Sequence, residues 1–229
     1  MSEGLTRAAV YERELPVSTE RVWENVHDWE HLPYLHSTAF CGIELDEAGA
    51  WGWRARVQVP PREAPSELLI ELRLEGDTGR YHTRTLEGPG TGADTITTVM
   101  ARGERASAVR VEFWVPEPDA DRAALIGRGM VALYTRLWDE DERMMVERQS
   151  FLDRREAPRT ASPEAHDLGP VAALAGTSPV VETARGPLRV VEVDGRWQAV
   201  SALCPHLGGP LHDAPVEEGH LICPWHGYR

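Results

Sequence analysis

Four residues near the end of the chain have types and spacing that suit them to bind iron. Cys204 and His206 form a C-x-H sequence, Cys223 and His226 form a C-x-x-H sequence, and sixteen residues separate the two pairs. Each pair offers one thiolate and one imidazole. Two thiolates on one iron and two imidazoles on the other complete the ligand set of a 2Fe–2S cluster. The spacing therefore predicts two matched loops that hold such a cluster between them.

Glycine and proline flank the four ligands. Gly208, Gly209 and Gly227 carry no Cβ, so backbone amides can approach the bridging sulfides of a cluster. Pro205 and Pro224 stiffen the two loops. A tetrahedral zinc site is the alternative for two Cys and two His. Zinc fingers usually pair Cys with Cys and His with His, on a short helix, whereas each loop here supplies one of each.

This segment resembles Rieske domains at all four ligand positions, in the Gly-Gly-Pro after the first pair and in the Trp-His-Gly-Tyr around the second. The resemblance implies a cluster held by Cys204, His206, Cys223 and His226. High-potential respiratory members carry an additional Cys in each loop, where this chain has Leu207 and Trp225. The resemblance is thus to the oxygenase and ferredoxin type, with a potential in the lower part of the range.

A second candidate metal site follows the first predicted helix. Asp28, His31 and His36 form a D-x2-H-x4-H sequence around Pro33, which we expect to end the helix. Two imidazoles at this spacing can converge on one ion. With one carboxylate they form a triad that binds Fe(II) and leaves positions open for oxygen. The alternative is that these histidines are ordinary polar residues of a loop.

The missing carboxylate has candidates on a long helix expected over residues 120–152, where Asp139, Glu140, Asp141 and Glu142 follow one another. The apolar residues Ile126, Met130, Leu133, Leu137 and Met144 are predicted to form its packed face. Asp141 lies four residues after Leu137 and three before Met144, so it should point inward. Asp139 should point outward, and Glu140 is intermediate.

Both motifs together resemble Rieske non-haem iron oxygenases. That resemblance implies mononuclear iron on His31, His36 and a helix carboxylate, for which we select Asp141. It also implies that Asp28 connects the iron to a cluster ligand of a neighbouring subunit, within a homotrimer. The Rieske segment comes last here, whereas it usually comes first in that family.

The order of the expected elements predicts an α+β fold. Strands are expected at 8–15, 43–47, 51–59, 67–75, 80–87, 94–101 and 107–115, with period-two alternation and short turns. With the long helix they resemble the helix-grip fold of the START/SRPBCC superfamily, in which a curved antiparallel sheet wraps a C-terminal helix and encloses a cavity. Trp51 and Trp53 are expected to line that cavity.

Three segments are predicted along the chain. Residues 1–152 form a helix-grip catalytic or ligand-binding domain, 153–177 a linker, and 178–229 a small all-β Rieske domain with strands at 180–183, 188–193 and 197–201 and a hairpin turn at Asp194-Gly195. The chain stops three residues after His226. A Rieske fold needs further strands there, so we expect either that this domain is truncated or that its cluster is poorly held.

Composition narrows the class of protein. The formal net charge of −13 argues against a nucleic-acid surface. All 24 basic residues are Arg, which we interpret as a compositional bias. No apolar run approaches a membrane span, and residues 1–7 lack the apolar core of a signal peptide. Cys41 is left without a partner thiol, which favours a reducing, cytoplasmic location.

The sequence therefore favours an oxygenase component that uses O2 and electrons from a cluster to hydroxylate or demethylate a hydrophobic small molecule. No G-x-G-x-x-G sequence occurs, so a separate reductase or ferredoxin should supply the electrons. Two alternatives stay open. One is a START-like binding protein with a Rieske electron-transfer domain and no mononuclear iron, and the other is a plain Rieske electron carrier. An oxygenase should hold three irons per chain and the alternatives two.

Overall fold

The fold is described from a computed structural model that covers residues 4–156, 165–183, 186–193 and 195–229. Residues 1–3, part of the expected linker and Asp194 of the expected hairpin turn lie outside the described residues. The chain divides into two units, Met1–Val146 and Glu147–Arg229, which are described separately. The domain limits expected at 152 and 178 stay predictions.

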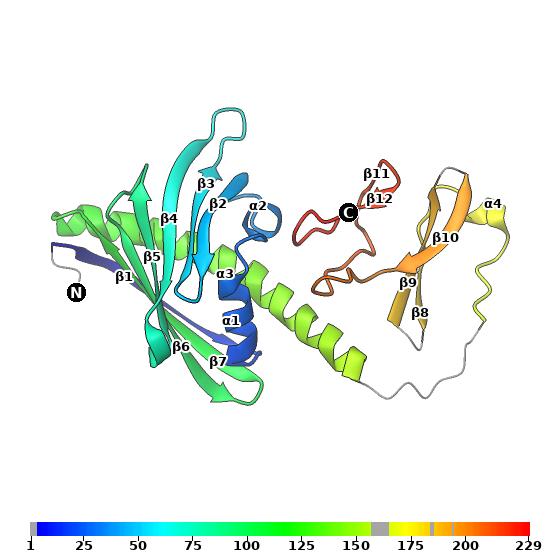
Figure 1. Ribbon diagram of the computed structural model, residues 1–229, viewed down its shortest axis with the longest axis horizontal. Helices are drawn as coiled ribbons and strands as arrows, with labels where there is room; N and C mark the ends of the chain where they lie inside the picture. The colour runs from blue at the N-terminus through cyan, green and yellow to red at the C-terminus, as the bar shows by residue number, and fades with distance from the viewer. Residues whose placement is uncertain (1–3, 157–164, 184–185, 194) are drawn as a thin grey trace. The chain divides into compact units, whose positions relative to one another are not determined.

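A seven-stranded antiparallel sheet forms the body of the first unit, in the order β1-β7-β6-β5-β4-β3-β2 (Figure 1). Its strands are β1 (Thr6–Leu15), β2 (Gly42–Gly49), β3 (Gly52–Val59), β4 (Ser66–Leu74), β5 (Arg80–Glu87), β6 (Asp94–Gly103) and β7 (Ala106–Val115). A 3-10 turn, η1 (Gly76–Thr78), joins β4 to β5. Strands β2 to β7 run as a meander and β1 pairs with β7, so the predicted strands and the α+β class are confirmed.

Alternation along β7 shows why this sequence forms a half-buried strand. Val109, Val111 and Phe113 are buried in the core, whereas Arg110 and Glu112 point to the other face. There the Arg110 guanidinium lies 3.1 Å from the Glu112 carboxylate. Successive side chains of a strand point to opposite faces, so one face is apolar and the other carries ion pairs.

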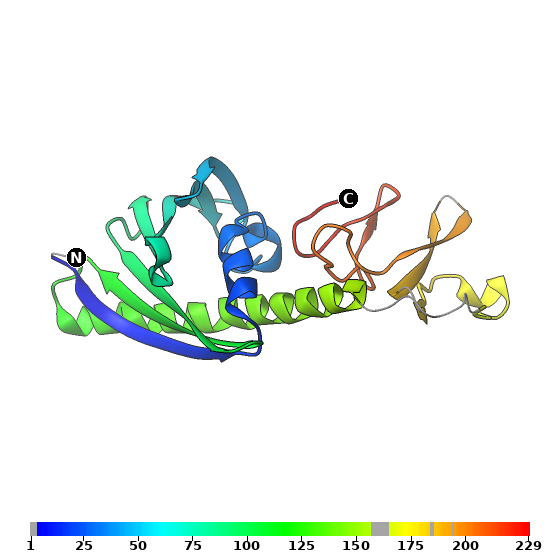
Figure 2. The ribbon, with the colours of Figure 1, turned by 60° about the horizontal axis from the view of Figure 1, so that its bottom comes forward.

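The long helix α3 (Ala120–Glu156) runs along the concave face of the sheet as far as the end of the first unit (Figure 2). The prediction that Ile126 lies on its packed face is wrong, because that side chain is 41% exposed. Gly127 is buried instead, and a Cβ there would lie 2.3 Å from the carbonyl oxygen of Ala8 on β1. Because Gly127 has no side chain, α3 can approach β1 closely. The face of α3 that packs on the sheet therefore includes Gly127 rather than Ile126.

The first helix is shorter than predicted. Ser18 caps α1 (Thr19–His27), as expected, by accepting a hydrogen bond from the Arg21 amide at 3.4 Å. Pro33 does not end that helix, because it lies in the first turn of a separate helix, α2 (Leu32–Leu35), where its fixed φ is favourable. Each motif residue therefore lies at a helix end: Asp28 is the C-cap of α1, and His31 and His36 are the N-cap and C-cap of α2.

Small β elements form most of the second unit. Strands β8 (Val180–Thr183), β9 (Gly186–Val193) and β10 (Arg196–Ser201) make an antiparallel sheet, after a short helix α4 (Val171–Leu174). A hairpin of β11 (Val216–Glu217) and β12 (His220–Leu221) follows, and its turn places Glu218 and Gly219 at φ of 49° and 79°. In the described parts of the chain, no helix combines the length and apolarity needed to cross a membrane.

Candidate functional site

Two loops with the same backbone pattern carry the predicted cluster ligands. Each begins with Cys-Pro, and the glycine four residues later donates a hydrogen bond to the cysteine carbonyl: Gly208 to Cys204 at 2.9 Å and Gly227 to Cys223 at 2.8 Å. Each cysteine amide donates in turn to the carbonyl of the residue after that glycine, at 2.8 Å in both loops. The chain therefore builds the same backbone loop twice, with the histidine two residues after the cysteine in one loop and three residues after it in the other.

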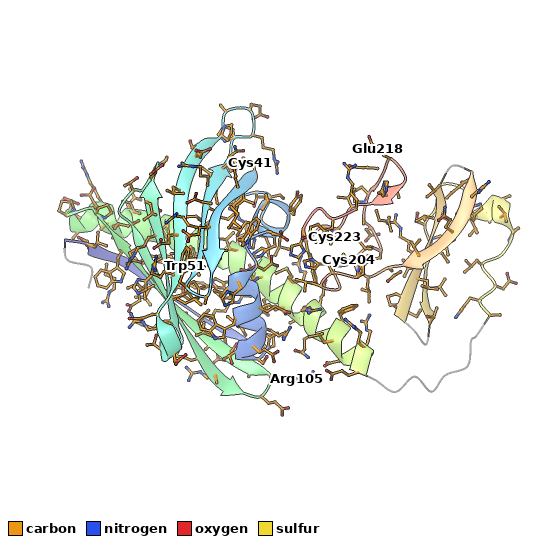
Figure 3. The ribbon with its side chains drawn as sticks, in the orientation of Figure 1. Cys41, Trp51, Arg105, Cys204, Glu218 and Cys223 are labelled. Atoms are coloured by element: carbon orange, nitrogen blue, oxygen red, sulfur yellow. The ribbon has the colours of Figure 1, made fainter. Side chains whose placement is uncertain are left out.

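The thiols gather together, and so do the imidazoles. Cys204 and Cys223 are buried and lie side by side (Figure 3). A hydrogen bond from Cys223 lowers the pKa of Cys204 to about 6, against the opposing effect of burial. The rings of His206 and His226 lie 4.7 Å apart between centroids. In a Rieske cluster, two thiolates bind one iron and two imidazoles bind the other, so this pairing of side chains is the arrangement that such a cluster requires.

Close packing surrounds the sulfurs. A Cβ on Gly209 would lie 2.9 Å from Cys223 Sγ and 3.0 Å from the ring of Trp225, which leaves room for glycine alone. Trp225 is 3% exposed, in agreement with the expectation that it shields the site. On the open side, the ring of Tyr228 lies 4.8 Å from that of His206.

The zinc alternative fits this geometry poorly. Tetrahedral zinc draws all four ligand atoms to within ~4 Å of one another. Among the described residues, the one group of three or more ligand atoms that lie within 4.8 Å of one another is in the first unit and includes none of the four cluster residues. The loops therefore form two pairs of ligands rather than one tetrahedron.

The group in the first unit consists of His31, His36 and Asp141, all buried. Asp141 Oδ1 lies 3.1 Å from His36 Nε2 and 3.5 Å from His31 Nε2, and the two rings cross at 73°. Ligands bound at ~2.1 Å and at right angles around one ion lie ~3 Å apart. The three atoms are thus close to the separations that a shared metal ion imposes.

The other nitrogen of each imidazole faces a second carboxylate. Asp28 Oδ2 lies 3.5 Å from His31 Nδ1, and Glu140 Oε2 lies 2.6 Å from His36 Nδ1. Histidines that bind metals usually hydrogen-bond a carboxylate in this way, which fixes the ring and leaves the other nitrogen for the metal. Asn25 adds a hydrogen bond of 3.0 Å to Asp141 Oδ1.

Charge is concentrated in this buried group. Burial alone would lower the pKa of His36, but hydrogen bonds and charge from Asp141 and Glu140 outweigh it and raise the pKa. Burial would raise the pKa of Asp141, but His36 and His31 outweigh it and lower the pKa. The carboxylate is therefore held ionised inside the protein, where an uncompensated charge is costly and a cation is favourable.

The four consecutive acids on α3 contact three different basic partners. Asp141 faces the histidines and Glu140 orients His36, whereas Asp139 and Glu142 both bind Arg13 of β1, at 2.5 and 2.6 Å. The predictions that Asp141 points inward and Asp139 outward are confirmed by their burial. The contributions of Glu140, Asn25 and Arg13 were not predicted. An acid next to a candidate ligand is the signal that could have identified Glu140.

A cavity of about 120 Å³ adjoins the three residues, and Trp53 is among the side chains that line it. The matching prediction for Trp51 is wrong, because Trp51 lies in the turn before β3, outside that lining (Figure 3). The Arg73 guanidinium lies 4.8 Å from its ring centroid. The turn releases Trp51 from the alternation of the strand.

Comparison with known proteins defines the class of the second unit. A family described as the Rieske 2Fe-2S domain matches residues 165–229, so this part of the chain is a Rieske domain, a class that holds a 2Fe–2S cluster and transfers electrons. Apoptosis-inducing factor 3 of Mus musculus and of Homo sapiens are each 38% identical over 47 residues, which is 20% of this chain. The match covers 8% of these relatives, so the chain spans less than a tenth of their length.

Solved structures with a START-like fold resemble the chain in shape. A START superfamily protein from Mycobacterium smegmatis aligns over 59% of this chain and 91% of its own, with a TM-score of 0.44 and 15% identity. Norcoclaurine synthase from Thalictrum flavum aligns over 64% and 90%, with a TM-score of 0.49 and 21% identity. The topology of sheet and helix identifies the first unit as a helix-grip fold. The small β Rieske domain follows it along the chain.

Proposed function

We propose that this chain is the oxygenase component of a Rieske non-haem iron system. The observation that carries the proposal is the convergence of His31, His36 and Asp141 in a chain that also contains a Rieske domain. The substrate is a hydrophobic small molecule bound in the cavity of the helix-grip unit, and the reaction is a hydroxylation or demethylation.

The residues at the centre fit Fe(II). Two imidazole nitrogens and one carboxylate form a facial set that leaves coordination positions open, and iron in such a set supplies activation of O2. Asp28 and Glu140 hold the imidazoles by their other nitrogens. The apolar lining, which includes Trp53, Leu72 and Trp138, excludes water and holds the hydrocarbon part of the substrate.

Electrons would come from a separate reductase or ferredoxin through the Rieske domain. We propose that this domain serves the iron of a neighbouring subunit in a head-to-tail homotrimer, since heterologous contacts can close into a ring. Asp28 is the proposed connection, because its carboxylate already lies 3.5 Å from one proposed iron ligand and can accept a second hydrogen bond.

Iron content tests the proposal directly. After anaerobic reconstitution with iron and sulfide, the wild-type chain should hold three irons, the His36→Ala variant two, and the Cys223→Ser variant one. The His36→Ala variant should keep the Rieske absorption spectrum, and a circular dichroism spectrum like that of the wild-type chain shows that the first unit, which carries the substitution, is folded. A wild-type chain with two irons, or a His36→Ala variant with undiminished iron, would contradict the oxygenase assignment.

A ligand-binding protein with an electron-transfer domain is the second candidate, favoured by the cavity itself. It predicts a Rieske spectrum and two irons per chain, with ligand binding that is the same with and without added iron.

A further inference from the structure

Arg189 on β9 places a positive charge inside the Rieske domain, where the residue is only 7% exposed. Its Nη1 donates hydrogen bonds to the carbonyl oxygens of Leu211 at 2.8 Å and of Ala214 at 2.5 Å. Its Nε is buried and has no hydrogen-bond partner among the described residues. Buried arginines are usually paired with a carboxylate, but no carboxylate in the described part of the chain forms an ion pair with this one.

The side chain of Arg189 lies on the face of β9 that turns toward the cluster loops. Side chains two residues apart on a strand share a face, so Arg189, Val191 and Val193 point to the same side of the sheet. Val191 and Val193 line a cavity of this domain together with Cys204 and Cys223. The guanidinium and the cluster cysteines are therefore on the same side of β9.

Hydrogen bonds connect the guanidinium to the first cluster loop. Leu211, which accepts one of its hydrogen bonds, donates from its own amide to the carbonyl of Ala202 at 2.7 Å. Cys204 follows Ala202 by two residues, and the Cys204 amide donates to the carbonyl of Gly209 at 2.8 Å. These contacts hold the charge of Arg189 at a fixed place relative to the loop.

A fixed positive charge in a protein interior favours negative charge near it. Arginine keeps its charge in proteins, and the effect of that charge is larger inside a protein than in water, because the effective dielectric constant is lower. When a donor passes one electron to a Rieske cluster, the donor is oxidised and the cluster gains one negative charge. Net charge is one of the factors that set the potential of such clusters. A guanidinium without a carboxylate partner therefore stabilises the reduced form.

We propose that Arg189 raises the reduction potential of the 2Fe–2S cluster through its buried charge. The hydrogen bonds to Leu211 and Ala214 keep that charge on the cluster side of β9. The cluster is then easier for a reductase or ferredoxin to reduce than its four ligands alone would make it. This inference goes beyond the proposed function, because it concerns the Rieske domain and needs no iron in the first unit.

The test is a spectroscopic redox titration of the full chain reconstituted with its cluster. Arg189→Gln removes the charge but keeps an amide that can donate to the two carbonyls, Arg189→Met removes both, and Arg189→Lys keeps the charge. At the midpoint potential of the wild-type chain, the ratio of reduced to oxidised cluster should fall about tenfold in the Gln and Met variants, which is about 59 mV for one electron. The ratio in the Lys variant should stay within about threefold of wild type.

Arg196→Gln is the matched control. Arg196 lies on β10 in the same sheet and is exposed, so water and salt screen its charge. Its loss changes the net charge of the domain by the same amount and should alter the ratio by less than about twofold. Acid-labile sulfide per chain measures the cluster content of each variant.

Four results would overturn the inference. An unchanged ratio in the Gln and Met variants would show that the charge does not act on the cluster. An equal fall in the Lys variant would assign the effect to the geometry of the guanidinium, and an equal fall in Arg196→Gln would assign it to net charge. Loss of the cluster from both neutral variants would show that Arg189 serves the fold of the loops. A chain that holds two irons and shows the expected shift would retain this inference and lose the oxygenase proposal.

Discussion

Glu140 Oε2 lies 2.6 Å from Nδ1 of His36, while Nε2 of the same ring lies 3.1 Å from Asp141 Oδ1. Two consecutive acids of α3 therefore hold the two nitrogens of one imidazole. With the ring fixed in this way, the proposed iron ligand needs no rotation before it binds. The contact also raises the basicity of the nitrogen that would face the metal.

Glu140→Gln should weaken iron binding at the His31, His36 and Asp141 site by about 10- to 100-fold, as losses of such supporting carboxylates do. The affinity is measured by competition with a chelator of known strength, with circular dichroism as the check on the folding of the first unit. Asp139→Asn is the control on the adjacent residue, since Asp139 binds Arg13 and its side chain is 57% exposed. Equal losses in both variants would mean that Glu140 acts only through the charge of the helix.

Asp28→Asn should retain both metal centres but slow electron transfer from cluster to iron by about 10- to 100-fold. The carboxylate lies 3.5 Å from His31 Nδ1, and an amide there accepts hydrogen bonds less strongly. The measurement is a single turnover with pre-reduced cluster, following its reoxidation after substrate and O2 are added. Glu20→Gln, which alters an 81% exposed side chain on α1, is the control. A wild-type rate for Asp28→Asn would remove the proposed connection.

Two glycines on α3 should respond oppositely to alanine. Gly129→Ala should stabilise the protein by about 0.5–1 kcal/mol, because no atom lies within 4 Å of the new Cβ and glycine is unfavourable within helices. Gly127→Ala should cost about 1–3 kcal/mol, because its Cβ would lie 2.3 Å from the Ala8 carbonyl oxygen. Urea unfolding of both variants measures the difference. Stabilisation by both would show that α3 can move away from β1 without cost.

Gly209→Ala should reduce cluster occupancy. The new Cβ would lie 2.9 Å from Cys223 Sγ, so either that sulfur or Trp225 must move, and overpacking of this kind costs about 1–3 kcal/mol. Acid-labile sulfide per chain and the Rieske absorption spectrum measure occupancy after reconstitution. Full occupancy with an unchanged spectrum would show that the loops tolerate the added methyl group.

Glu71 should make a measurable contribution to stability at neutral pH. Hydrogen bonds from Arg73, opposed by partial burial, lower the pKa of Glu71 below its ordinary 4.5. Because its folded pKa is depressed, the stabilisation is complete above pH 4.5 and is lost as the pH falls through the lower, folded value.

Glu71→Gln should therefore cost about 1 kcal/mol at pH 7 and should flatten the loss of stability below pH 4.5. Urea unfolding at a series of pH values measures this. Glu67→Gln is the control on the same face of β4, since Glu67 is 53% exposed and lies 3.5 Å from Arg56. An unchanged pH profile for Glu71→Gln would show that the Arg73 contact adds nothing to stability.

Local patterns in the sequence predicted the strands well, because alternation and turn residues determine a half-buried antiparallel strand with little outside help. The inward direction of Asp141 also followed from helical spacing. The predictions failed at positions whose burial depends on contact with another element of the fold. Ile126 is exposed because β1 approaches α3 at Gly127, a contact between residues distant in the sequence.

At Pro33 the local sequence alone was also insufficient to predict the structure. A proline can end one helix or begin the next, and its sequence neighbours allow both; the structure uses it in the first turn of α2. The supporting contacts of Asn25, Glu140 and Arg13 could not be derived from spacing either, because each joins elements more than a hundred residues apart.

The distance between these residues in the sequence also determines the order in which the two sites can form during translation. The Asp141 contact with His36 joins residues 105 positions apart, so the triad is complete only after the ribosome has made most of the helix-grip unit. The ligands of the cluster all follow residue 203 and lie within a single short stretch of chain. During translation, the histidine and carboxylate pocket can therefore form while the cysteine loops have not yet been synthesised. The proposed mononuclear iron site and the cluster site thus become available one after the other.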